Sequence, residues 1–80
     1  MIRATILELC EKRYPATICP SEVARHLSED EATWRAMMPQ VRDVANEMAR
    51  ARLIEITQKN VVLDLAQPYA GAIRLRLVKA

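Results

Sequence analysis

The pattern of apolar and polar positions divides the chain into three helical segments followed by strand segments. In the longest helical segment, residues 33–52, apolar side chains recur every three or four positions, which places them on one face of a helix. The opposite face is polar, so we expect an amphipathic helix with its apolar face on the core. The apolar positions are Trp34, Met37, Met38, Val41, Val44, Ala45 and Met48.

Two shorter helices are expected upstream. Residues 2–12 carry apolar side chains at helical spacing, and Tyr14-Pro15 ends this helix because the residue before a proline avoids helical geometry. Residues 21–27 form the second helix, with Pro20 in its first turn. Cys19 falls at its cap position, where the side chain of Glu22 can reach back to the cap backbone.

The start of the long helix depends on the acidic turn at 28–31 and on Pro39. Ser28 and Glu31 have the spacing of a capping box. A helix that starts near Glu31 encloses Pro39 at a cost of roughly 3 kcal/mol, whereas one that starts at Met38 accepts it freely. We expect helical structure across the whole stretch, with an irregularity just before Pro39.

The C-terminal third has the alternation typical of strands. Residues 53–58 and 73–77 alternate apolar and polar side chains, and 61–63 favours extended backbone. Lys59-Asn60 predicts a tight turn, because Asn tolerates positive φ. Residues 64–71, which contain Pro68 and the single glycine, predict a loop.

This order of elements predicts a fold class. A helix, a short extended piece at 16–18, a second helix, a longer helix and a pair of strands follow each other as in a winged helix-turn-helix. Eighty residues suffice for one α+β domain spanning 1–80, with three helices and a small antiparallel sheet. With no Phe and three aromatic residues, its core must be aliphatic, with Met filling gaps.

Several segments resemble a known family. Residues 18–25 (Ile-Cys-Pro-Ser-Glu-Val-Ala-Arg) and 34–42 (Trp-Arg-Ala-Met-Met-Pro-Gln-Val-Arg), with 54–58 and 71–76, are similar to those of a family of small bacterial proteins of unknown function. The chain departs from that family at Lys59-Asn60, where members tend to have glycines. The resemblance implies a winged-helix domain and no particular activity.

Charge and residue type suggest duplex DNA as a partner. The net charge is +2, with residues 1–40 at −1 (five basic, six acidic) and residues 41–80 at +3 (seven basic, four acidic). On the long helix, Arg42, Asn46 and Arg50 recur every four residues, and Arg and Asn pair bidentately with guanine and adenine. Basic side chains on the strands would contact phosphates. These are Lys59, Arg74 and Arg76.

The alternative is a winged helix used for protein interaction or self-association. Asp43 and Glu47 lie beside the Arg42 stripe, and carboxylates meet a phosphate-lined groove at a cost. The same stripe could then be an ordinary solvated face. Trp34 and Met38 are expected in the core, whereas Met37 fits either the core or a partner surface.

The sequence gives little support for a catalytic site, a cofactor site or a metal site. The single histidine, His26, has no carboxylate at a convincing spacing, and one glycine cannot form a phosphate-cradling loop. Cys10, Cys19 and His26 lack the spacing of a zinc site. We therefore expect Cys10 in the core, Cys19 at a helix cap and His26 exposed.

We expect no signal peptide, because Arg3, Glu8 and Glu11 interrupt the N-terminal apolar residues. No apolar run approaches the ~20 residues that a membrane span requires. We expect a cytoplasmic protein with reduced thiols and no membrane partner.

Overall fold

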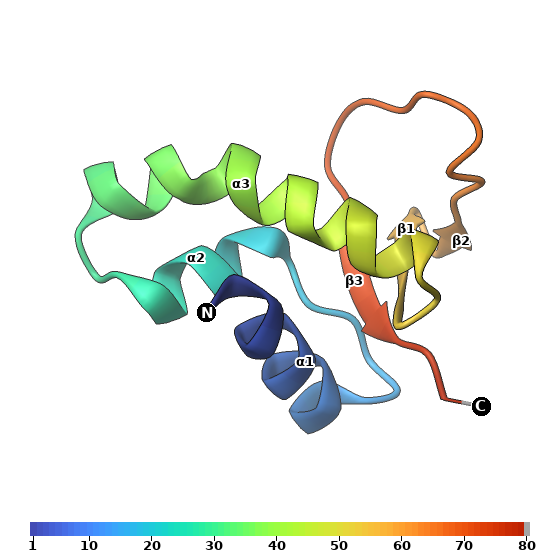
Figure 1. The fold of residues 1–80 in the computed structure, drawn as a ribbon, viewed down its shortest axis with the longest axis horizontal. Coiled ribbons are helices and arrows are strands. Elements are labelled where there is room, and N and C mark those ends of the chain that lie inside the picture. The colour runs from blue at the N-terminus through green and yellow to red at the C-terminus, as the bar shows by residue number, and fades with distance from the viewer. Residues whose placement is uncertain (80) are drawn as a thin grey trace.

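The computed structural model describes residues 1–79 and has three helices packed against a three-stranded antiparallel sheet (Figure 1). This confirms the predicted α+β class and is compatible with a winged helix. The elements are α1 (Ile2–Arg13), α2 (Pro20–Leu27), α3 (Glu31–Arg50), β1 (Ile54–Gln58), β2 (Val61–Val62) and β3 (Arg74–Leu77).

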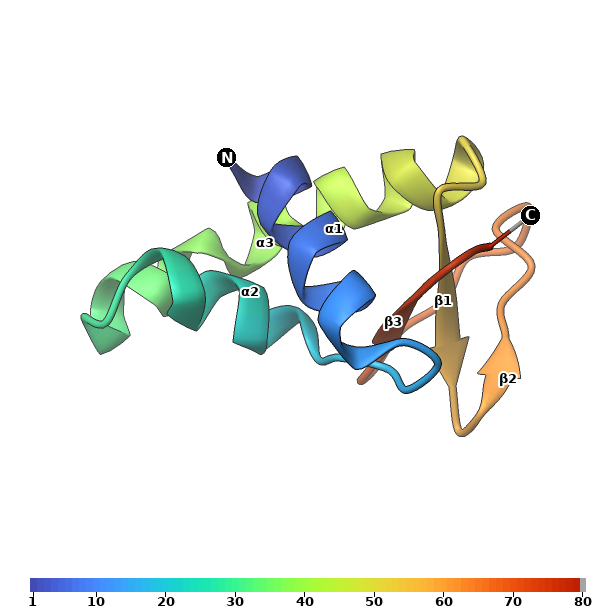
Figure 2. The same cartoon turned by 90° about the horizontal axis from the view of Figure 1, so that it is seen from below.

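The sheet has the strand order β2-β1-β3, and both pairings are antiparallel. Ile56 lies opposite Leu75 in the register of β1 and β3. The predicted extended piece at 16–18 contributes one bridge, in which Ile18 and Leu75 exchange two backbone hydrogen bonds of 2.8 Å. Figure 2 shows β1 leaving the C-terminal end of α3 and running away from it toward the turn with β2.

The tight turn expected at Lys59-Asn60 is confirmed. Lys59 and Asn60 have φ angles of +50° and +67°, and the register pairs Gln58 with Val61 directly across the turn. Two central residues with positive φ match the right-handed twist of the flanking strands. The hairpin therefore closes without a glycine in its turn.

The N-terminus of α3 differs from the expected capping box. Asp30 is the cap, and its carboxylate accepts hydrogen bonds from the backbone N–H of Thr33 at 3.0 Å and from its hydroxyl at 2.7 Å. These bonds lower the pKa of Asp30. Ser28 instead accepts from the N–H of Asp30, so the Ser28–Glu31 prediction was wrong. The residue next to the helix, with the stronger acceptor, takes the cap position.

α3 runs continuously from Glu31 to Arg50 with Pro39 inside it, as expected for helical structure across the whole stretch. The helix ends abruptly after Arg50. The N–H groups of Arg52 and Leu53 donate to the carbonyls of Ala49 and Met48, both at 3.0 Å. Arg52 has a φ of +64°, the left-handed position where glycine is usual. This geometry turns the chain directly into β1.

The core is aliphatic, as composition predicted, and lies between the helices and one face of β1 and β3. Cys10 belongs to it, whereas Trp34, Met37 and Met38 are half-buried at its edge. The largest fully buried side chains are Ile6, Ile18, Met48, Ile54, Ile56, Leu75, Val23, Val41 and Cys10.

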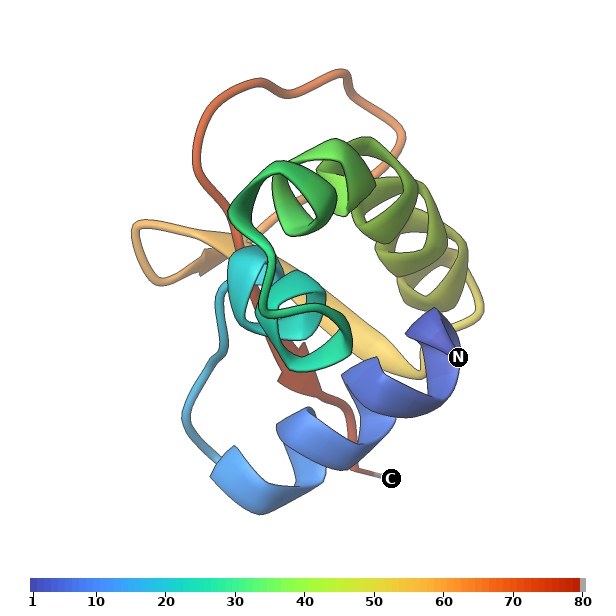
Figure 3. The same cartoon turned by 90° about the vertical axis from the view of Figure 1, so that its left-hand side faces the viewer.

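Residues 63–73 connect β2 to β3, and we call this segment the strap. It has no regular helix or strand, in agreement with the loop predicted at 64–71. The strap arches along the side of α3 that faces away from α1 (Figures 1 and 3). Gln58 holds its C-terminal part by donating to the carbonyls of Ala70 and Ala72 at 2.7 and 3.3 Å.

Candidate nucleic-acid interface

Two of the three base-reading candidates on α3 are attached to the strap. Arg42 donates to the carbonyl of Gly71 at 3.0 Å, and the hydroxyl of Tyr69 donates to Oδ1 of Asn46 at 2.6 Å. Both α3 side chains are half-buried as a result. This face of α3, which was expected to meet DNA, is therefore in contact with the protein's own strap.

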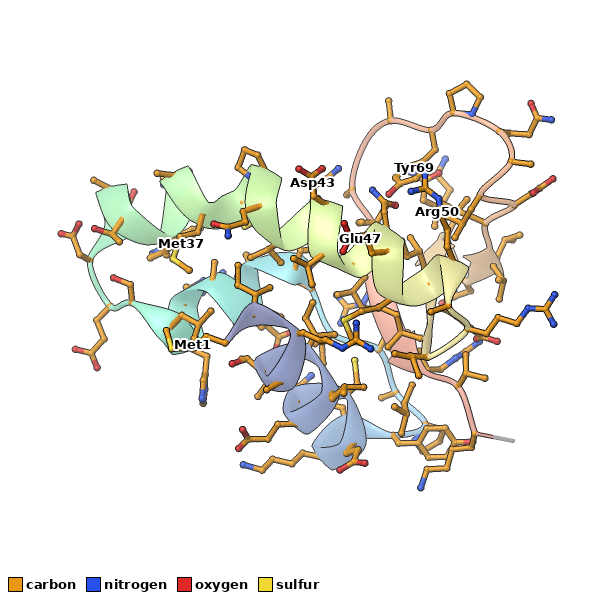
Figure 4. All side chains as sticks on the ribbon, viewed as in Figure 1. Met1, Met37, Asp43, Glu47, Arg50 and Tyr69 are labelled. Atoms are coloured by element: carbon orange, nitrogen blue, oxygen red, sulfur yellow. The ribbon has the colours of Figure 1, made fainter. Side chains whose placement is uncertain are left out.

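Arg50, the third candidate, is exposed and points toward the same region as Tyr69 (Figure 4). It lines a hollow of about 550 Å³ between the C-terminal half of α3 and the strap. Within residues 1–79, its side chain has no hydrogen-bond or ion-pair partner. Arg50 thus stays available to a ligand.

The two strand arginines have different surroundings. Arg74 is exposed and contacts the segment before α2, with bonds of 2.5 Å to Thr17 Oγ1, 3.1 Å to Thr17 O and 2.8 Å to Cys19 Sγ. Arg76 lies opposite Glu55 in the sheet and forms an ion pair with it at 2.7 Å. A half-exposed pair of this kind contributes about 0–1 kcal/mol to stability, but it already neutralises Arg76.

Three of the six predicted residues surround the C-terminal end of the strap. Lys59, exposed at the β1–β2 turn, and Arg74 line one hollow of about 740 Å³ together with Gly71. Arg42 reaches the same glycine from α3. Residues distant in sequence thus bring Lys59 and Arg74 to one hollow, and Gly71, which also lines it, accepts the hydrogen bond from Arg42.

Sequence reasoning missed two further cations, Arg25 and Arg35. Their guanidinium groups lie over the ring of Trp34, at 5.1 and 4.9 Å from its centre. Arg35 precedes Arg42 by seven residues, which puts both on the same side of α3. That spacing was a usable signal for Arg35, whereas the position of Arg25 depends on how α2 packs on α3. We call the group Arg25, Arg35, Arg42, Lys59 and Arg74 the basic flank.

The two carboxylates that argued against DNA contact lie on other sides of α3 than Arg42, and Asp43 lines the hollow beside Arg50. At 100° per helical residue, Asp43 lies about 100° and Glu47 about 140° around α3 from Arg42. Both are exposed, and Figure 4 shows Asp43 on the upper side of α3 and Glu47 on the side facing the viewer. On the flank itself, Glu31 pairs with Arg35 at 2.8 Å.

The two cysteines have structural surroundings, and Cys19 accepts a hydrogen bond from Arg74 of the basic flank. Burial, with a smaller effect from Glu22, raises the pKa of Cys10 to about 11. Cys19 is half-buried at the N-cap of α2, where Glu22 accepts from its N–H at 2.7 Å, and His26 is exposed. Across residues 1–79, no three His, Cys, Asp or Glu side chains gather in a way that could hold a metal ion.

None of the helices that the structure describes is both long enough and apolar enough for a membrane span. Comparison with known proteins gives one family. A family model with the description "Protein of unknown function (DUF3253)" matches residues 1–78, nearly the whole chain. No curated protein matches the sequence.

Proposed function

Because the chain belongs to the DUF3253 family, whose description names no activity, its role has to be argued from its own surface, and we propose that it binds duplex DNA through the basic flank. The observation that supports this most is that Lys59 and Arg74 line one hollow with Gly71, whose carbonyl accepts from Arg42. Arg25 and Arg35 add two cations around Trp34, where Glu31 pairs with Arg35. An action in the cytoplasm is part of the proposal, supported by two free thiols.

Phosphates, rather than base edges, are the expected targets. The side-chain oxygen of Asn46 already accepts from Tyr69, and Arg42 donates to Gly71. Neither side chain is therefore free to form a bidentate contact with a base edge. Guanidinium and ammonium groups on the flank can still donate to phosphate oxygens. Binding of this kind depends on salt and not on sequence, with Kd values of roughly 10⁻⁴–10⁻⁶ M at physiological salt.

A salt titration with a mixed-sequence duplex tests the proposal. The double variant Arg25→Ala/Lys59→Ala removes two flank cations, whereas Arg3→Ala/Lys12→Ala removes two cations from α1 as a matched control. We expect the slope of log affinity against log salt to fall by about 0.9 for each lost phosphate contact. The control variant should keep the wild-type slope. Equal slopes for both double variants, or no binding by the wild type at low salt, would refute DNA binding by this flank.

Protein association is a second candidate, favoured by the edge strand β2. Val61 and Val62 are 64% and 50% exposed, and within residues 1–79 β2 pairs only with β1, which leaves its other edge free. Free strand edges with apolar side chains add strands from other chains. Light scattering of the wild type and of Val61→Thr/Val62→Thr tests this candidate: association predicts a larger particle that the variant loses, and a monomer in both cases excludes self-association.

A further inference from the structure

The hollow between α3 and the strap is a second candidate site, which shares Arg42 with the basic flank but is otherwise lined by other residues. Asn46 and Arg50 line it from α3, and Pro68 and Tyr69 line it from the strap, around a space of about 550 Å³. The Tyr69–Asn46 bond of 2.6 Å and the Arg42–Gly71 bond of 3.0 Å fix the strap beside α3. The walls are therefore already in place before any ligand arrives.

Hydrogen-bond donors dominate the polar lining. Arg50 contributes five N–H donors and has no hydrogen-bond or ion-pair partner among the described residues. Arg42 uses one donor group on Gly71, and Asn46 accepts from Tyr69 through its oxygen, which leaves its amide N–H groups. Asp43 is the one carboxylate in the lining, so the side-chain charges sum to +1.

The remaining walls are apolar and partly flat. Pro39 from α3 and Leu65 and Pro68 from the strap line the hollow beside the ring of Tyr69. Small-molecule sites typically combine such walls with a few polar groups that fix orientation. The lining thus offers an anion anchor next to a surface for a ring.

We propose that this hollow binds a small organic oxyanion, a carboxylate or phosphate carried on a flat apolar group. The guanidinium of Arg50 pairs with the oxyanion, since its planar fork matches two oxygens at once. The amide of Asn46 donates to the same group, and the ring packs between Pro68 and Tyr69. This proposal does not rest on DNA binding, because its anchor Arg50 lies outside the basic flank, with which the hollow shares Arg42.

Four probes test the site by ¹⁵N-detected NMR titration of the full chain: phenyl phosphate, benzoate, phenol and inorganic phosphate. We expect saturable shifts at the Asn46 side-chain amide and at the backbone of Arg50 and Tyr69 with both ringed anions. Phenol and inorganic phosphate should bind about tenfold more weakly, because each lacks one half of the ligand. Phenyl phosphate and benzoate together identify which oxyanion the site prefers.

The variant Arg50→Ala should weaken binding of the ringed anions by about tenfold or more. Arg35→Ala, which removes an exposed α3 arginine outside the hollow, is the matched control and should leave binding unchanged. Lys59→Ala should also leave it unchanged, which separates this site from DNA binding. The proposal is overturned if neither ringed anion gives a saturable shift, if inorganic phosphate binds as tightly, or if Arg50→Ala binds like the wild type.

Discussion

The interior and the strap are stabilised by different forces. Interior side chains such as Ile6, Val41 and Leu75 are completely buried, and the sheet adds a regular backbone ladder. The strap has no such ladder to α3. Its Ile73 belongs to the core and Leu63, Leu65 and Tyr69 pack at the core's edge, while side-chain hydrogen bonds from Arg42 and Tyr69 attach it to α3. Apolar burial therefore specifies the fold, whereas the candidate binding surfaces depend on partial apolar packing together with a few polar contacts.

The largest expected effect comes from the interior. Leu75→Ala removes a fully buried side chain between Ile18 and Ile56 and should lower the free energy of unfolding by about 2–5 kcal/mol. Leu65→Ala, the matched change in the half-buried strap, should cost about 1 kcal/mol or less. Urea denaturation measures both values, and similar losses would mean that the strap belongs to the cooperative core.

The buried thiol of Cys10 predicts a pH dependence confined to the interior. Its pKa is raised to about 11 in the folded chain, so the protonated thiol is favoured by folding. The unfolded chain loses this proton near pH 9, so its stabilising contribution is complete below that pH. It is lost as the pH rises toward 11, by up to about 2–3 kcal/mol.

Denaturation of the wild type and of Cys10→Ala at several alkaline pH values isolates this effect from the titration of lysines. The difference in stability between the two proteins should shrink or reverse between pH 9 and 11. A difference that stays constant over this interval would contradict a buried, protonated Cys10. The half-buried Cys19 should meanwhile react with a thiol reagent in the native state, whereas Cys10 should not.

The smallest effect on global stability is expected in the strap. Tyr69→Phe removes the hydroxyl that donates to Asn46 and should lower the free energy of unfolding by about 0.5–1.5 kcal/mol. Locally it should free the strap, so that thermolysin cleaves residues 63–73 faster. Tyr14→Phe is the control, because no hydrogen bond from the Tyr14 hydroxyl occurs in the described chain. Equal cleavage rates for the two variants would show that Tyr69 does not hold the strap.

Elements with a strong apolar period were predictable from the sequence. The Trp34–Met48 face gave the long helix, and the alternation at 73–77 gave the strand that became β3. Which polar side chain caps a helix was harder to predict from the sequence. Ser28 with Glu31 had the spacing of a capping box, but Asp30 sits directly before the helix and offers a carboxylate to Thr33. Spacing alone does not rank two competing acceptors.

The candidate site was only partly predictable, because its geometry depends on long-range contacts. Residues 64–71 were expected to be a loop, but nothing in the sequence shows that Tyr69 would meet Asn46, 23 residues away. The pairing of Arg76 with Glu55 depends on the register of two strands. The stack of Arg25 on Trp34 depends on how α2 packs against α3.

The most direct test of the proposed DNA contact is a map of chemical-shift changes on the protein. A mixed-sequence duplex titrated into labelled protein at low salt should shift the signals of Arg25, Arg35 and Lys59. The backbone signals of Asp43 and Glu47, on the other sides of α3, should change little. Shifts centred on Asp43 and Glu47, or no shifts at all, would contradict DNA binding through the basic flank.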